Sequence, residues 1–136
     1  MLNIMKFCRT TALAFLAAGS FLPSAAASPD AMSLKFPDVV DVKVRASGTD
    51  RFDFDATISS PYDTPKRYAD AFRVLDRDGR VFGERILQHD HANEQPFTRD
   101  LYGISIPHGL RTVVIQARDL KYGYGGKTFE IALPGR

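Results

Sequence analysis

The feature that most constrains the fold is a pair of apolar rows with a period of two. Two runs alternate apolar with polar residues on either side of the segment 47–50, their apolar members being Val40, Val42, Val44 and Ala46, then Phe52, Phe54, Ala56 and Ile58. Successive side chains of a strand point to opposite faces, so this pattern predicts a β-hairpin with one buried row. On the outer row, Asp53 and Asp55 are expected to pair with Arg45 and Lys43.

Further short strands are expected along the rest of the chain, over 80–87, 97–101, 112–118 and 129–133. Residues 66–75 fit two structures. The spacing of Tyr68, Phe72 and Leu75 suits a short helix, whereas the Asp78-Gly79 turn favours a strand that pairs with 80–87. We favour the strand, because a helix would leave 80–87 without its hairpin partner.

About seven short strands with turns between them predict an all-β, two-layer β-sandwich over residues 39–136. The arrangement resembles an immunoglobulin-like or fibronectin type III-like β-sandwich in architecture, without the tryptophan and cysteine pair of antibody domains. The stretch 68–133 is also similar to small uncharacterised bacterial exported proteins, through the Glu-Gln-Pro-Phe-Thr-Arg segment at 94–99 and the Gly-Tyr-Gly-Gly-Lys loop at 123–127. That resemblance implies no activity.

The first 27 residues read as a cleavable signal peptide. Lys6 and Arg9 precede the largely apolar run 12–22, Pro23 ends that run, and small residues lead to a cleavage site between Ala27 and Ser28. The run is too short for a bilayer, which argues against an uncleaved anchor. We therefore expect a periplasmic or secreted protein with no membrane span after cleavage, and an extended segment at 28–38 ahead of the domain.

Charge and cysteine content exclude further classes of function. The formal net charge of +2 falls to zero when the two basic residues of the leader are removed, and the chain has no run of basic residues, so no nucleic-acid partner is expected. The single cysteine, Cys8, lies in the leader. The mature chain therefore has no thiol for a disulfide, a metal site or a nucleophile.

Three histidines form one candidate site. His89 and His91 lie two residues apart and would share one side of an extended segment, and His108 follows in a later turn. Imidazole nitrogens bind copper and zinc, and Asp90, Glu94 or Asp100 could add an oxygen ligand. The alternative is that the histidines are solvated or hydrogen-bonded residues of a polar loop.

The glycine-rich loop 119–127 carries the other candidate residues, Tyr122, Tyr124 and Lys127. Tyrosines on such a loop offer rigid contact area for a ligand or a partner. The simpler alternative is that the glycines supply positive φ and the tyrosines pack back on the sheet edge. A phosphate-binding loop is excluded, because the required first glycine is Lys121 and a strand follows instead of a helix.

The sequence therefore favours an exported, non-catalytic binding or interaction module, with an unknown periplasmic protein or small ligand as its partner and no cofactor. The alternative is a copper- or zinc-binding protein that uses His89 and His91. An enzyme is not expected, because a thiol-free domain with three histidines offers few ways to build a nucleophile and its base.

Overall fold

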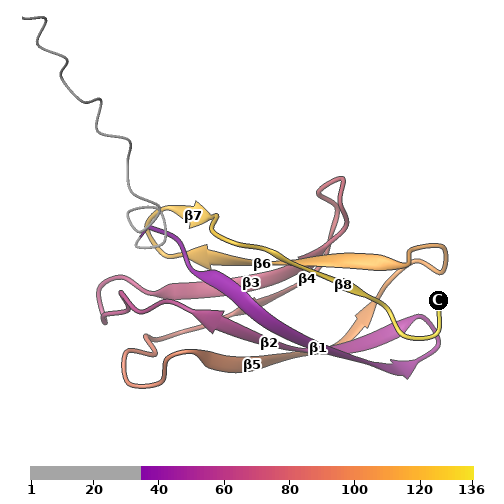
Figure 1. The fold of residues 1–136 in the computed structure, drawn as a ribbon, viewed down its shortest axis with the longest axis horizontal. Helices are drawn as coiled ribbons and strands as arrows, with labels where there is room; N and C mark the ends of the chain where they lie inside the picture. Colours follow the sequence, from indigo (N-terminus) through magenta and orange to yellow (C-terminus); the bar gives the residue numbers. More distant parts are fainter. Residues whose placement is uncertain (1–34) are drawn as a thin grey trace, which may run out of the picture.

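The computed structural model describes residues 35–136, which form antiparallel strands and no helix (Figure 1). The strands are β1 (Asp38–Gly48), β2 (Arg51–Ser59), β3 (Ala69–Leu75), β4 (Val81–Ile86), β5 (Phe97–Ser105), β6 (Thr112–Asp119), β7 (Gly123–Tyr124) and β8 (Phe129–Ala132). The seven expected strands are all present. The additional one, β7, is a two-residue strand inside the glycine-rich loop. The predicted leader and its cleavage site lie outside the described residues.

Two sheets face each other, one of strand order β1-β2-β5 and one of order β4-β3-β6-β7 with β8 also paired to β6. The all-β sandwich predicted from the sequence is confirmed. Its core is built from the inward rows of both sheets and is filled by Val39, Val42, Phe52, Phe54, Ala56, Ile58, Ala69, Phe72, Val74, Leu87, Phe97, Ile106, Val113, Ile115, Ala117 and Leu133. Alternate residues of β2 and β6 are fully buried, as the period of two predicts.

The predicted β1–β2 hairpin is present, with Val44 opposite Phe54 and Arg45 opposite Asp53. On its outer face, Arg45 pairs with Asp53 at 3.4 Å and with Asp55 at 3.1 Å. Charge pairing across the strands is therefore confirmed for Arg45, which contacts both carboxylates. Among residues 35–136, no ion pair joins Lys43 to either of them.

Two residues of β1 that were expected to face inward are exposed. A register shift between Val39 and Asp41 inserts Val40 as an extra residue, so Val39 faces the core and Val40 is 46% exposed. Ala46, also expected inside, lies next to a second register shift near the end of the strand and is exposed. Alternation along a single strand cannot reveal such a bulge, because neighbouring valines satisfy either register.

Residues 69–75 form a strand, so the helical alternative for this segment is wrong. β3 pairs with β4 on one side and with β6 on the other, and Asp76 orders the turn between β3 and β4 by accepting hydrogen bonds from the N–H groups of Asp78 and Arg80. Gly79 has φ +91° in that turn, a conformation that glycine adopts without steric cost. The turn chemistry, and not the helical spacing of apolar residues, decided the local structure.

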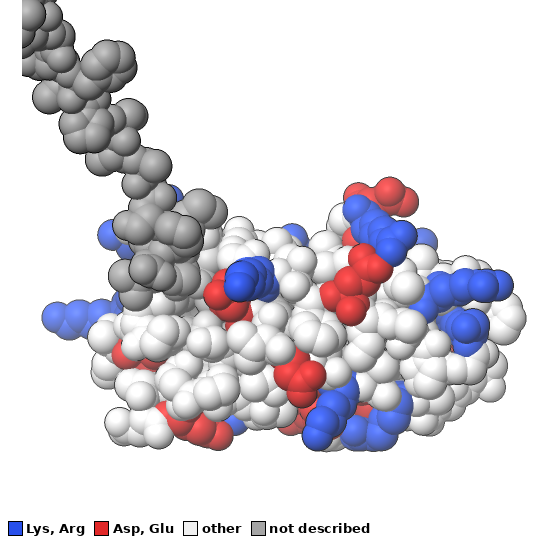
Figure 2. Space-filling view, in the orientation of Figure 1, with Lys and Arg blue, Asp and Glu red and all other residues white. Residues whose placement is uncertain are grey.

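The antiparallel order places the connections at two ends of the sandwich. One end, called the loop end below, holds the long loops 60–68, 87–96 and 120–128, and the other, the far end, holds the turns 49–50, 76–80 and 106–111 together with residues 133–136 (Figure 1). Acidic and basic side chains are interspersed over the middle of the face drawn in Figure 2.

Candidate functional site

The loop end brings together residues from loops that are far apart in the sequence. Asp63, in the loop 60–68, is 5% exposed and reaches two neighbouring segments. One carboxylate oxygen accepts a hydrogen bond from the Ala69 N–H at 3.1 Å, and the other accepts one from the His91 N–H at 3.0 Å. A buried carboxylate thus ties the loop 60–68 to the loop 87–96.

A second set of polar contacts joins the same two loops. The Ser60 N–H donates to the Gln95 side-chain oxygen at 2.7 Å, and the Gln95 amide donates to the Ser60 hydroxyl at 3.2 Å and to the His91 carbonyl at 3.1 Å. Side chains therefore replace the missing strand pairing in this region. The loop 87–96 is held in one conformation although it has no regular structure of its own.

The histidine pair lies on this ordered loop. The ring centroids of His89 and His91 are 4.9 Å apart, and the His91 ring stacks on Phe97 at 4.0 Å. His89 directs Nδ1 at the Asp90 carbonyl, 2.9 Å away. His91 is only 6% exposed, and its Nδ1 has no hydrogen-bond partner in the part of the chain described.

The surroundings of His91 favour its neutral form. Burial lowers the pKa of His91 below its ordinary value, and the charges of Arg99 and His89 lower it further. Asp63 and Glu94 oppose this effect without overcoming it. A neutral imidazole keeps one nitrogen as donor and one as acceptor.

Two pockets share His89, His91 and Arg99 as lining residues. One, of about 340 Å³, extends along the end of β4 past Arg85, and the other, of about 310 Å³, follows the loop toward Glu94. A binding site of this size suits a small ligand group rather than a large cofactor.

The structure brings together only part of the predicted metal site. His108 lies at the far end, beyond the opposite end of β5, where its Nδ1 is 3.0 Å from Asp50. Of the predicted oxygen ligands, Glu94 is paired with Arg99 at 2.9 Å and Asp100 with Arg85 at 3.1 Å. Within residues 35–136, no group of three or more His, Cys, Asp or Glu side chains is arranged to hold a metal ion.

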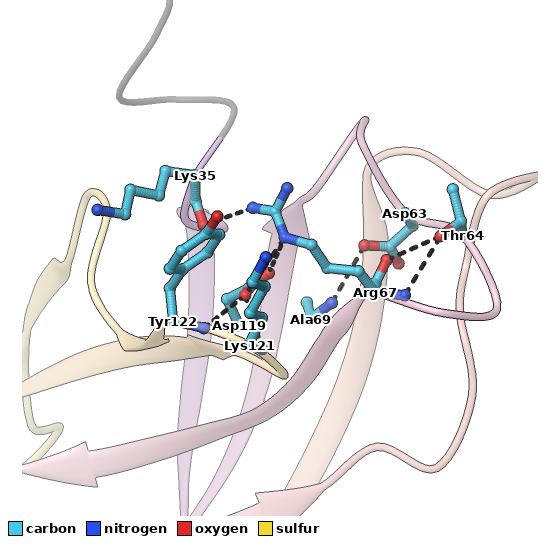
Figure 3. A network of polar contacts seen from close by, with 8 residues as sticks. All are labelled: Lys35, Asp63, Thr64, Arg67, Ala69, Asp119, Lys121 and Tyr122. Atoms are coloured by element: carbon cyan, nitrogen blue, oxygen red, sulfur yellow. Dashed lines mark hydrogen bonds and ion pairs between the residues drawn. The ribbon is translucent and has the colours of Figure 1, made fainter.

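Across the loop end, Asp119 organises the start of the glycine-rich loop (Figure 3). Its side chain is fully buried and accepts hydrogen bonds from the N–H groups of Lys121 and Tyr122 at 2.9 and 2.8 Å. Arg67 adds an ion pair at 3.2 Å. Burial alone would raise the pKa of Asp119, but the nearby Tyr62 hydroxyl and the two N–H donors outweigh it and hold that pKa below its ordinary value.

Arg67 is enclosed by aromatic rings. Its guanidinium carbon lies 4.2 Å from the centre of the Tyr62 ring and 4.8 Å from that of Tyr122. Its Nη2 donates to the Lys35 carbonyl at 2.7 Å (Figure 3). Such contacts combine cation–π attraction with packing. They fix one face of Tyr122, which remains 42% exposed at the surface.

The other two residues of the predicted tyrosine surface have structural contacts. Tyr124 lies under the Arg73 guanidinium at 3.6 Å and donates its hydroxyl hydrogen to Glu84, on the outer face of the sheet. The Lys127 N–H donates to Asp38 at 2.7 Å, and its carbonyl accepts from Val39. These are backbone contacts, and Lys127 is exposed, as is Tyr122; of the two tyrosines, Tyr122 is the one that the structure leaves exposed at the loop end.

Sequence reasoning missed the two buried aspartates. Asp119 carried a sign of its role, because it continues the inward positions 113, 115 and 117 of β6, where an apolar residue is expected. A carboxylate at a core position predicts buried hydrogen-bond donors around it. Asp63 and Arg67 lie in a loop without periodicity, and only the folded structure shows their partners.

No family model, curated protein or solved structure matches this chain. The function must therefore be inferred from the loop end itself. For the stretch 35–136, there is no helix with the length and apolar character needed to cross a membrane.

Proposed function

We propose that this protein is an exported, non-catalytic binding domain that acts through its loop end. The observation that supports the proposal is that side-chain hydrogen bonds hold the loops of this end in place. Two buried carboxylates, Asp63 and Asp119, order three loops by hydrogen bonds to their backbone, while Tyr122 remains exposed. A surface that is ordered before binding loses less conformational entropy when a partner arrives.

The sandwich supports this role as a scaffold. Binding residues are commonly found on loops held by a rigid framework, and immunoglobulin-type domains use the loops at one end of the sandwich in this way. The strand order β1-β2-β5 facing β4-β3-β6 supports assigning the chain to that broad architectural group. The resemblance to small exported bacterial proteins stays a prediction.

The test compares partner recovery from periplasmic extract by the wild type, Tyr122→Ala and His108→Ala. The last is a matched control, because His108 is exposed at the far end. We expect quantitative mass spectrometry to find partners that are lost with Tyr122→Ala and kept with His108→Ala. Equal recovery by all three proteins would contradict the proposed role of the loop end in binding a macromolecule.

A further inference from the structure

The larger pocket of the loop end is lined by hydrogen-bond donors and by no acidic residue. Its polar side chains are Arg85, Gln88, His89, His91 and Arg99, and Ile86 and Leu87 complete the wall. The carboxylates that pair with the two arginines, Asp100 and Glu94, are not among its lining residues. The charged groups facing this pocket are therefore cationic.

Part of the Arg85 guanidinium is available to bind a ligand. Its Nη1 donates to the carbonyl and the carboxylate of Asp100, at 3.0 and 3.1 Å, whereas its Nε and Nη2 donate to no acceptor in the described part of the chain. A guanidinium can present two parallel N–H groups to one carboxylate or phosphate. Arg99 is more fully engaged, because both of its terminal nitrogens donate to Glu94.

His91 forms part of the wall of the same pocket. The residue is 6% exposed, and its Nδ1 is out of contact with solvent, so that atom does not face a ligand in the pocket. The ring still lies close to any anion bound there, and the charge of that anion would favour the imidazolium form. His91 therefore serves as a reporter of binding at this pocket.

We propose that this pocket binds the oxyanion group of a small ligand, a carboxylate or a phosphate, with Arg85 as the principal donor and the His91 ring in the pocket wall. Arg99 adds positive charge on the same side. The apolar wall at Ile86, which is 50% exposed, lies where the uncharged part of the ligand would extend. This inference deepens the proposed function by giving the loop end a ligand class, and to that extent rests on it.

The experiment titrates the purified full chain with inorganic phosphate and, separately, with acetate, at constant ionic strength. Two-dimensional NMR follows the imidazole resonances of His89, His91 and His108. We expect saturable shifts for His91 and a higher His91 pKa in the bound state, because an anion favours the imidazolium. His108, at the far end, should not respond.

Two arginine variants separate the site from general charge effects. Arg85→Gln should weaken binding about tenfold or more, since it removes the bidentate donor. Arg77→Gln removes a guanidinium of the same charge that is paired with Glu130 elsewhere on the surface, and it should leave binding unchanged. A response to phosphate alone or to acetate alone identifies which oxyanion the pocket prefers, and both support the proposal.

Three results would overturn it: no saturable shift with either anion, equal affinity in wild type and Arg85→Gln, or a saturable response to Zn(II) alone. Because this titration needs no macromolecular partner, its failure is distinguishable from failure of the extract experiment. Loss of partner recovery with Tyr122→Ala together with no anion binding would leave the binding domain in place and remove only the ligand class.

Discussion

Replacing Asp63 with alanine tests whether buried hydrogen bonds hold the loop end together. The change leaves two backbone N–H groups, of Ala69 and His91, without the acceptors that now lie at 3.1 and 3.0 Å. Each unsatisfied buried donor costs about 1–3 kcal/mol, so the free energy of unfolding should fall by about 2–6 kcal/mol. That is a large part of the ~5–15 kcal/mol of a typical domain.

Urea unfolding followed by far-ultraviolet circular dichroism measures this change, with Asp41→Ala as the control. Asp41 is an exposed carboxylate on β1, and its removal should alter stability by no more than about 0.5 kcal/mol. Hydrogen exchange should also speed up at the His91 amide in Asp63→Ala. A loss of stability below about 1 kcal/mol for Asp63→Ala would refute the view that this carboxylate orders the two loops.

Three further predictions follow from particular contacts. Burial lowers the pKa of His91 in the folded state, so the folded state holds this imidazole neutral. The stability that His91 contributes is therefore complete above its ordinary pKa of 6.5 and is lost as the pH falls below that value. The difference between the urea midpoints at pH 7.5 and at pH 5.5 should be smaller in His91→Phe than in the wild type. Gly126 has φ +76°, and an added Cβ would lie 2.2 Å from a backbone oxygen, so Gly126→Ala should cost about 2 kcal/mol or more in thermal unfolding, whereas Gly109→Ala, which meets nothing within 4 Å, should be nearly neutral. Arg99→Gln removes the ion pair with Glu94, whose side chain is 57% exposed, so urea unfolding should find a loss of no more than about 1 kcal/mol; a larger loss would contradict a minor contribution of this pair.

Much of the sandwich could be predicted from the sequence because burial follows a simple period. Phe52, Phe54 and Ile58 were placed correctly since one face of a strand in a two-layer fold must be apolar. Val40 was misplaced because a bulge shifts the register of β1 by one residue at this point. Val39 and Val40 are both valines, so either of them could have been the inward residue.

The site was harder to predict, because it depends on which loops meet at each end of the sandwich. His89 and His91 are adjacent in the sequence and stay together, whereas His108 is carried to the far end by the length of β5. Tyr124 packs on the outer sheet face through Arg73 and Glu84, contacts that depend on how β3, β4 and β6 pair. Neighbours on adjacent strands of one sheet can be identified only when the strand order is known.

The position of Arg136 has a practical consequence for measuring the interactions proposed above. Its guanidinium bonds to the carbonyls of Ile106, Pro107 and Leu110 and so keeps this residue at the far end, where Figure 1 marks the C-terminus. Tyr122 and His91 belong to loops of the loop end. A linker joined after Arg136 and attached to a sensor chip would orient every molecule with its binding loops toward solution. Immobilisation through this tail therefore suits kinetic experiments better than random coupling through lysines, one of which, Lys121, is next to Tyr122.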